Sequence, residues 1–162
     1  MSAPRAAIIT ISTSKAAGGG GEDESGARLA ALAEGIGAEI AGRELIPDDR
    51  ATIEQRLRHW AVGDCALILT TGGTGLAPSD LTPEATRAVI EREAPGIAEA
   101  MREASRPHTA NWMLSRGVAG VRGTTLIVNF PGSPRSIDQA GAGIAAALPH
   151  ALDLLAGRVR AH

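Results

Sequence analysis

The chain has 162 residues, a formal net charge of −2 and 44% hydrophobic residues. This length and composition allow a buried core without disulfide bonds, so we expect one soluble globular domain spanning residues 1–162. The near-neutral charge and the 2% aromatic content argue against a surface that binds nucleic acid. The apolar runs are too short for a signal peptide or a membrane-spanning helix, so we expect no membrane partner and a cytoplasmic location.

Cysteine and histidine give no sign of a metal centre. Cys65 is the only cysteine, which excludes an intrachain disulfide and a zinc site built from several thiolates. We expect it to be a small buried residue at the start of a strand. The histidines do not have the spacing of metal ligands. With so few aromatic residues, the core must consist of Ala, Val, Ile and Leu, which suits a parallel sheet covered by helices.

Apolar, β-branched runs alternate along the chain with segments of helical periodicity. Strands are expected at residues 6–11, 39–46, 67–71, 118–122 and 125–130. The resulting order, β-α-β-α-β-α-α-β-β-α, predicts an α/β protein: a three-layer α/β/α domain with a mostly parallel central sheet. Residues 106–116 give no clear pattern, and residues 157–162 are expected to form a loose tail.

Capping residues and prolines mark the expected helix starts. Ser25 is expected to cap one helix, and Thr82 to cap another that has proline at its first position. Pro95-Gly96 should separate this helix from the next. Ser133-Pro134 repeats the pattern of a cap followed by proline, and the helical segment that follows it is expected to break near Pro149.

The most informative stretch is the glycine loop Gly72–Gly75, which follows the strand at residues 67–71. Glycines allow backbone N–H groups to approach an anion closely. The loop lacks the Gly-Lys-Ser/Thr of a Walker A motif, and Pro78 stands where a dinucleotide fingerprint needs its third glycine. An anion site and a plain tight turn are therefore both open interpretations.

Two carboxylates accompany this loop. Asp80 precedes the helix after the loop, and Asp48 follows the second strand. If the second and third strands are parallel, both carboxylates lie at the carboxyl edge of the sheet. Such a pair suits Mg²⁺ and phosphoryl or nucleotidyl chemistry. Helix capping is the alternative role for each, although Asp49 could cap the helix next to Asp48 instead.

Two other loops are candidates for function. The loop Ser12–Glu24 is long and rich in glycine, as functional loops often are, but a flexible connection fits equally well. Lys15 within it could bind a phosphate or lie on the surface. The turn Pro131–Pro134 precedes a helix N-terminus that would favour an anion, although simple capping also explains it. Ser115-Arg116 could offer a hydroxyl and a cation, but an ordinary surface pair is the default interpretation.

A series of motifs resembles the MoaB/Mog family of molybdenum cofactor biosynthesis proteins, which includes the G domains of gephyrin. The motifs are Asp23-Glu24-Ser25-Gly26, Pro47-Asp48, Thr71–Gly75, Asp80–Thr86, Met113–Arg116 and Pro131–Pro134. The resemblance covers about residues 6–155, and the combination GGTG-x4-D-x-TPEAT is highly specific. It implies a three-layer α/β domain that assembles as a homotrimer or hexamer.

The resemblance also implies an activity, molybdopterin adenylyltransferase: Mg²⁺-dependent transfer of AMP from ATP to molybdopterin, with release of pyrophosphate. It assigns Asp48 and Asp80 to catalysis and metal binding. The substrate- and nucleotide-binding residues that it implies are Ser12, Asp23, Ser25, Gly26, Thr71, Gly72, Gly73, Thr74, Gly75, Glu84, Ser115, Pro131, Gly132 and Ser133. A downstream molybdate-insertion protein is the further partner implied.

Two positions depart from the family pattern. Thr13 stands where many members carry an aspartate after the first strand, and Ser79 stands where some carry an arginine before the catalytic aspartate. The main alternative is therefore a homologue that binds molybdopterin, or acts as a scaffold, without turning over ATP. A different nucleotide- or phosphosugar-binding enzyme is a weaker alternative. The sequence does not distinguish a trimer from a hexamer, or a molybdenum from a tungsten pathway.

Overall fold

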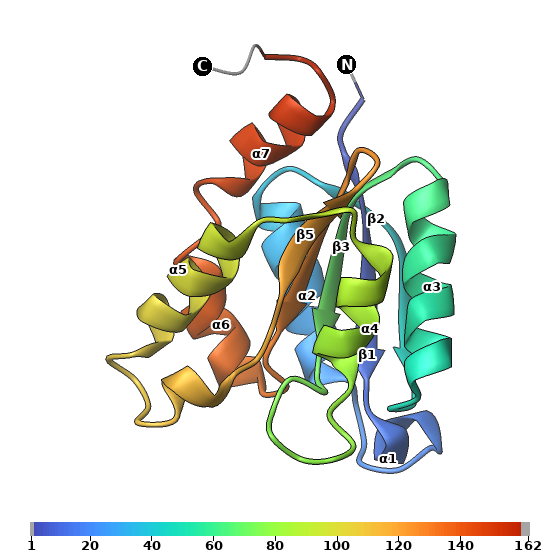
Figure 1. The fold of residues 1–162 in the computed structure, drawn as a ribbon, viewed down its shortest axis with the longest axis vertical. Helices are drawn as coiled ribbons and strands as arrows, with labels where there is room; N and C mark the ends of the chain where they lie inside the picture. Colours follow the sequence, from blue (N-terminus) through green and yellow to red (C-terminus); the bar gives the residue numbers. More distant parts are fainter. Residues whose placement is uncertain (1, 160–162) are drawn as a thin grey trace.

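The computed structural model describes residues 2–159 as two layers of helices around a central sheet (Figure 1). In chain order the elements are β1 (Arg5–Ile11), α1 (Thr13–Ala16), α2 (Glu24–Gly35), β2 (Glu39–Ile46), α3 (Arg50–Val62), β3 (Cys65–Thr71), α4 (Thr82–Val89), β4 (Arg92–Glu93), α5 (Pro95–Ser105), the 3₁₀ turn η1 (Trp112–Leu114), β5 (Ala119–Arg122), β6 (Thr125–Phe130), α6 (Pro134–Ala142) and α7 (Leu148–Leu155). No described helix is long and apolar enough to span a bilayer.

The sheet has six strands in the order β2-β1-β3-β6-β5-β4. The strands β2, β1, β3 and β6 are mutually parallel, and β5 pairs antiparallel with both of its neighbours. The register places Ile46 beside Ile11, and Thr71 beside Phe130. The carboxyl ends of these four strands therefore meet along one edge, which lies at the bottom of Figure 1 beside α1. This confirms the predicted mostly parallel sheet.

Alternate residues of each strand pack against opposite helix layers, as the pleat of a strand requires. Ile8 of β1 packs in a cluster with residues of α2, α5, α6 and α7. Ile9, the next residue, packs in a second cluster with residues of α3 and α4. Both faces of the central strands are buried, which explains why they read as continuous apolar runs.

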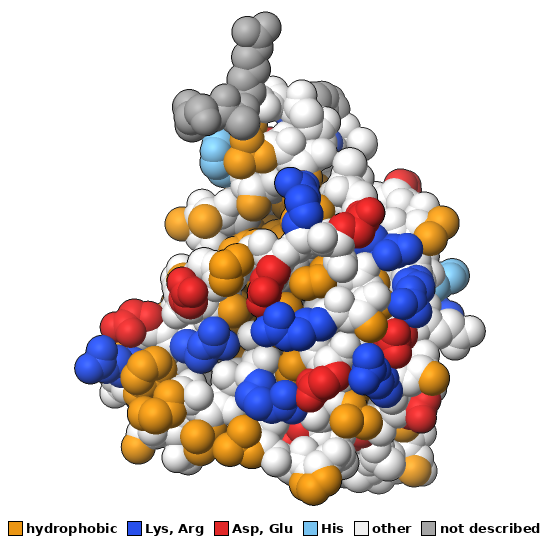
Figure 2. All heavy atoms as spheres, viewed as in Figure 1, with side chains coloured by type: hydrophobic (Ala, Val, Ile, Leu, Met, Phe, Trp, Pro, Cys, Tyr) orange, Lys and Arg blue, Asp and Glu red, His pale blue; other side chains and the backbone are white. Residues whose placement is uncertain are grey.

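Charges of both signs alternate on the face shown in Figure 2. Arg87 pairs with Glu93 at 3.0 Å, and Arg116 pairs with Glu84 at 2.8 Å. The described residues of this face therefore carry no field of a single sign, which agrees with the small net charge of the chain.

Several predicted strand bounds are confirmed. The bounds of β2 and β6 are those predicted. Cys65 lies at the start of β3, two residues before the predicted start, and its side chain is buried as expected. Burial also raises the pKa of the Cys65 thiol.

Two of the predicted helix caps are wrong. The carboxylate of Asp23 caps α2 by accepting from Gly26 N at 3.0 Å, while the Ser25 hydroxyl donates to the carbonyl of Gly132 at 2.7 Å. Thr82 is the first residue of α4, and its hydroxyl donates to Gly72 O at 2.9 Å instead of capping. In both cases the hydroxyl that the local pattern assigns to the cap instead donates to a backbone carbonyl outside its own helix.

The predicted cap at Ser133 is confirmed, because its Oγ accepts from Ser136 N at 3.2 Å. Two proline assignments need correction. Pro95 is the first residue of α5, so residues 90–94, which include β4, separate the two helices. The last helical segment breaks at residues 143–147, and Pro149 lies in the first turn of α7, where proline is tolerated. Half of the predicted tail, residues 160–162, lies outside the described residues.

Candidate functional site

The glycine loop follows β3 and packs tightly against the sheet edge. Gly72 has φ +97°, and a Cβ placed there would lie 2.2 Å from the carbonyl oxygen of Ile11. Gly73 has φ +68°, and its Cβ would lie 2.3 Å from Thr82 Oγ1. Both residues must therefore be glycine, because of conformation and because of space. Thr71, the last residue of β3, anchors the neighbouring loop by donating to Pro131 O at 2.6 Å.

A cavity of about 350 Å³ opens beside this loop. Its volume lies within the range of about 300–1,000 Å³ that is typical of small-molecule sites. It is lined by Gly73, Thr74, Gly75, Asp80, Asn111, Leu114, Ser115, Pro131 and Gly132. The structure thus brings one predicted catalytic carboxylate together with predicted binding residues from three loops that are far apart in the sequence.

Asp80 is held within its own loop. Its Oδ2 accepts a hydrogen bond from Ala77 N at 3.0 Å, and its backbone N–H donates to Ala77 O at 2.9 Å. Oδ1 of Asp80 accepts no hydrogen bond from the residues that the structure describes. One carboxylate oxygen therefore fixes the turn while the other is available to a ligand.

Asp48 lies on the other side of the loop and does not line the cavity. Its Oδ2 accepts from Thr13 N at 3.0 Å and from Thr13 Oγ1 at 2.8 Å, and Asp48 N donates back to Thr13 Oγ1 at 3.0 Å. Asp48 Oδ1 lies 3.2 Å from the position that a Cβ on Gly73 would occupy, so this carboxylate borders the glycine loop. The threonine that departs from the family pattern is thus the partner of a predicted catalytic residue.

Asp49, rather than Asp48, caps α3. Its Oδ2 accepts from Thr52 Oγ1 at 2.6 Å and from Thr52 N at 2.9 Å. The hydrogen bond from the Thr52 hydroxyl, and to a smaller extent the bond from the Thr52 backbone N–H, hold the pKa of the Asp49 carboxyl below its ordinary value. Asp48 is therefore not required as a helix cap.

The predicted residues of the first loop are engaged in bonds within the protein. Asp23 Oδ2 accepts from Thr10 Oγ1 at 2.8 Å, and a Cβ on Gly26 would lie 2.2 Å from this same oxygen. Ser12 caps the short helix α1, with its Oγ 3.4 Å from Lys15 N. Lys15 Nζ donates to two carbonyls of its own loop at 2.9 Å each, so it holds the loop together. None of these residues lines the cavity beside the glycine loop.

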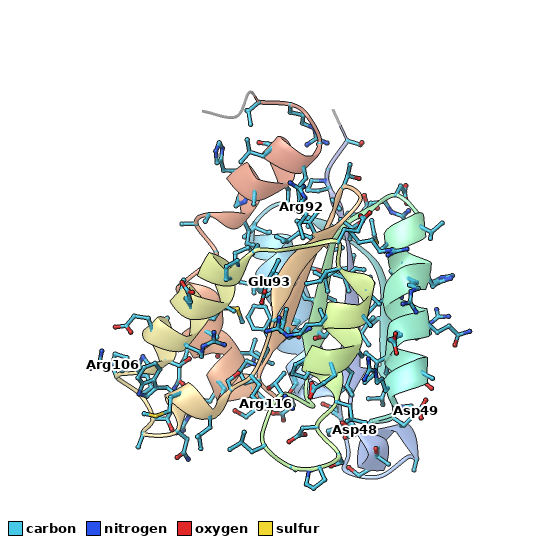
Figure 3. All side chains as sticks on the ribbon, in the orientation of Figure 1. Asp48, Asp49, Arg92, Glu93, Arg106 and Arg116 are labelled. Atoms are coloured by element: carbon cyan, nitrogen blue, oxygen red, sulfur yellow. The ribbon has the colours of Figure 1, made fainter. Side chains whose placement is uncertain are left out.

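Glu84 and Arg116 form a pair next to the cavity. Arg116 Nη1 donates to Glu84 Oε1 at 2.8 Å and to Oε2 at 3.2 Å. Figure 3 shows Arg116 toward the same end of the molecule as Asp48. Neither Glu84 nor Arg116 lines the cavity, and both border a neighbouring one of about 610 Å³. Sequence reasoning considered Arg116 only as a possible cation within the motif Met113–Arg116 and gave it no structural role. It missed Asn111, which belongs to no pattern that marks a site.

The two carboxylates are ligands of the chemical type that Mg²⁺ binds. Hard oxygen donors suit Mg²⁺, which commonly takes one or two carboxylates together with phosphate oxygens and water. Asp48 and Asp80 each have one carboxylate oxygen outside the hydrogen bonds just described. Among the described residues, no group of three or more His, Cys, Asp or Glu could hold a metal alone. Substrate phosphates and water would therefore have to complete such a site.

Sequence comparison places these residues in a known context. The model of a family described as probable molybdopterin binding domain matches residues 7–150. The molybdopterin adenylyltransferase of Escherichia coli K12 is 44% identical over 126 residues, which cover 70% of this chain and 65% of that protein. The molybdenum cofactor synthesis protein cinnamon of Drosophila melanogaster is 42% identical over 139 residues, 83% of this chain and 23% of that protein. The chain thus matches just under two thirds of the first relative and about a quarter of the second.

Solved structures share the fold over nearly their whole length. The molybdopterin biosynthesis enzyme MoaB of Thermus thermophilus has 45% identity and a TM-score of 0.88, with 94% of this chain and 96% of that chain covered. The molybdopterin biosynthesis Mog protein of Mycobacterium ulcerans has 40% identity and a TM-score of 0.87, with 94% and 99% covered. The chain therefore belongs to the family of probable molybdopterin binding domains, together with the MoaB and Mog proteins.

Proposed function

We propose that this protein is a molybdopterin adenylyltransferase, which transfers AMP from ATP to molybdopterin and releases pyrophosphate. The observation that carries the proposal is the cavity in which the glycine loop, Asp80 and Ser115 meet at the carboxyl edge of the sheet. Ligands of α/β proteins bind in this position. Curated relatives that are 41–44% identical and bear this name support the choice of substrates.

In the proposed reaction, the terminal phosphate of molybdopterin attacks the α-phosphorus of ATP. A new P–O bond forms, the bond between the α- and β-phosphates breaks, and pyrophosphate leaves. Such a reaction requires mainly positioning and charge stabilisation from the protein. The backbone N–H groups of Gly73–Gly75 would bind phosphate oxygens, and Asp48 and Asp80 would hold Mg²⁺. When bound, the ion would offset negative charge on the triphosphate.

The remaining predicted residues would shape the two sides of the site. On one side, Ser12, Asp23, Ser25 and Gly26 would keep the first loop in place, as their bonds within the protein suggest. On the other side, Ser115 and Pro131–Ser133 would border the second substrate, and the N-terminus of α6 after Ser133 would favour a phosphate. Glu84 would act through Arg116 rather than by touching a substrate.

We also propose a cytoplasmic homotrimer or hexamer that delivers its product to a molybdate-insertion protein. Only the resemblance to the family supports this part of the proposal. Analytical ultracentrifugation of the purified chain would separate a trimer from a hexamer, and a monomer at micromolar concentration would contradict both.

The test of the proposed function is pyrophosphate release from ATP in the presence of molybdopterin and Mg²⁺. We expect Asp80→Asn to lower the rate at least about 100-fold, the order lost when one group that stabilises transition-state charge is removed. Asp138→Asn, which removes a half-exposed carboxylate paired with Arg28, is the matched control and should keep the wild-type rate. An Asp80→Asn variant with full activity would overturn the role of Asp80.

One observation favours a second candidate, a homologue that binds molybdopterin without turnover. Thr13 donates to Asp48 Oδ2 through its backbone N–H and its hydroxyl, at the position where the family pattern given by the resemblance has an aspartate. If the wild-type protein binds molybdopterin in a titration but releases no pyrophosphate, this alternative is correct and the transferase proposal is wrong.

A further inference from the structure

The segment Thr74–Asp80 is held to the rest of the described chain mainly by one residue. Arg116 donates to three of its carbonyls, each at 2.8 Å: the backbone N–H to Thr74 O, Nε to Gly75 O and Nη2 to Asp80 O. Hydrogen bonds within the segment, between Ala77 and Asp80, close only its own turn. Because the segment belongs to no strand or helix, Arg116 supplies the contacts that a sheet would otherwise provide.

All three nitrogens of the Arg116 guanidinium group take part in this arrangement. Nε and Nη2 bond the segment, and Nη1 bonds both carboxylate oxygens of Glu84 in the first turn of α4. The planar fork of arginine can reach separate acceptors in fixed directions, which an ammonium group cannot do. Arg116 therefore fixes the segment in relation to α4.

Arg116 is itself anchored from a third element. Arg102 of α5 donates through Nη1 to Gly117 O at 3.2 Å and to Ser115 O at 3.4 Å. These bonds hold the backbone on both sides of Arg116. Ser115 lines the cavity beside the glycine loop, while the Arg116 side chain stays outside it. One short segment thus connects α5, α4 and the loop that carries Asp80.

We propose that Arg116 is a positioning residue that holds Thr74–Asp80, and with it the Asp80 carboxylate, in the form that accepts the nucleotide. The inference rests on the proposed function for its kinetic consequence, but the arrangement of the loop can be tested without turnover. Arg116 touches no substrate in this proposal. Because Arg116 orders the loop before the nucleotide arrives, nucleotide binding does not have to supply the free energy of ordering it, as in other pre-organised sites.

The first measurement is hydrogen–deuterium exchange of the free protein, followed by mass spectrometry. In Arg116→Ala we expect the hydrogen-bonded amides of Ala77 and Asp80 to exchange at least tenfold faster, with the strands β1 and β3 unchanged. Arg87→Ala is the matched control, since Arg87 also borders the neighbouring cavity and pairs with a glutamate, but does not contact the loop. Equal exchange in the wild type and Arg116→Ala would overturn the proposal.

The second measurement is steady-state kinetics with ATP. For Arg116→Ala we expect kcat/KM to fall about 100-fold, the order that a misplacement of about 1 Å causes, with a raised KM for ATP. The Arg116→Lys variant should retain only a minor part of the kcat/KM that Arg116→Ala loses. Guanidinium ion added to Arg116→Ala at millimolar concentration should restore more of it. A role in stability alone would lower kcat through loss of folded enzyme and leave KM unchanged, and that result would contradict the proposal.

The two measurements separate the two proposals. If the wild-type protein releases no pyrophosphate, the proposed function fails, and the exchange experiment still decides whether Arg116 holds the loop. If turnover is normal in the wild type and in Arg116→Ala, the positioning role fails and the proposed function stands.

Discussion

The two glycine-rich loops at the carboxyl edge differ in why they need glycine. In the first loop, Gly18 and Gly21 have φ of +90° and +71°, and a Cβ at either would meet nothing within 4 Å. In the second loop, Gly72 has a similar φ of +97°, but its Cβ would collide with the carbonyl of Ile11. Gly18 and Gly21 are needed for conformation alone, whereas Gly72 is also needed for close packing. Similar composition therefore gives an open loop in one place and a tightly held one in the other.

The largest expected effect tests this contrast directly. Gly72→Ala should lower the free energy of unfolding by about 2–5 kcal/mol, since a left-handed backbone and an overpacked contact both add to the cost. Gly18→Ala, at nearly the same φ but in open space, should lose at most about 1–2 kcal/mol. Urea unfolding of both variants gives the comparison. Equal losses would mean that the close approach to Ile11 has no energetic weight.

A smaller effect concerns the contact that joins the first loop to the rest of the edge. Ser25→Ala removes the donor to Gly132 O and should lower the free energy of unfolding by about 1 kcal/mol. Ser14→Ala, in an exposed part of the first loop, should change it by less than about 0.5 kcal/mol. The same urea measurement decides, and a Ser25→Ala variant as stable as Ser14→Ala would show that the first loop is not anchored through Ser25.

The smallest effect depends on pH and concerns the short turn between the two loops. The folded-state pKa of Asp49 is lowered by Thr52, so its contribution to stability is present above the ordinary value of 3.8 and is lost as pH falls through the folded value. The wild type should therefore unfold at a higher temperature than Asp49→Ala at pH 7, and the gap should shrink below about pH 4. A gap that stays constant from pH 7 to pH 3 would contradict the capping role of the carboxylate.

The strands could be predicted because their information is local. The bounds of β2 and β6 follow from apolar runs that end before Pro47 and Pro131, and proline is disfavoured inside a strand because it has no N–H to donate. The short elements α1 and β4 were not predicted, since four and two residues are too few to show a period.

The sequence indicates the residue types of the candidate site but not the bonds that connect them. The glycine loop and Asp80 follow a recognisable spacing. The bond from Ser25 to Gly132 spans 107 positions, and the bonds from Arg116 to Gly75 and Asp80 span 41 and 36. Most of the acceptors are backbone carbonyls, which any residue supplies, so no side-chain pattern marks them. Only the folded chain shows that Ser25, a predicted helix cap, and Arg116, a predicted surface residue, hold the loops of the candidate site.

The buried cysteine at the start of β3 offers a way to measure how often the folded chain opens. Cys65 is 4% exposed, and burial raises the pKa of its thiol, so the reactive thiolate is scarce in the folded chain. An alkylating reagent can react only when the chain opens around Cys65, at the start of β3. Because the sequence has no other cysteine, each chain can be labelled only once. The labelling rate therefore reports how often the chain opens around Cys65. It can be measured in every variant above without an added probe.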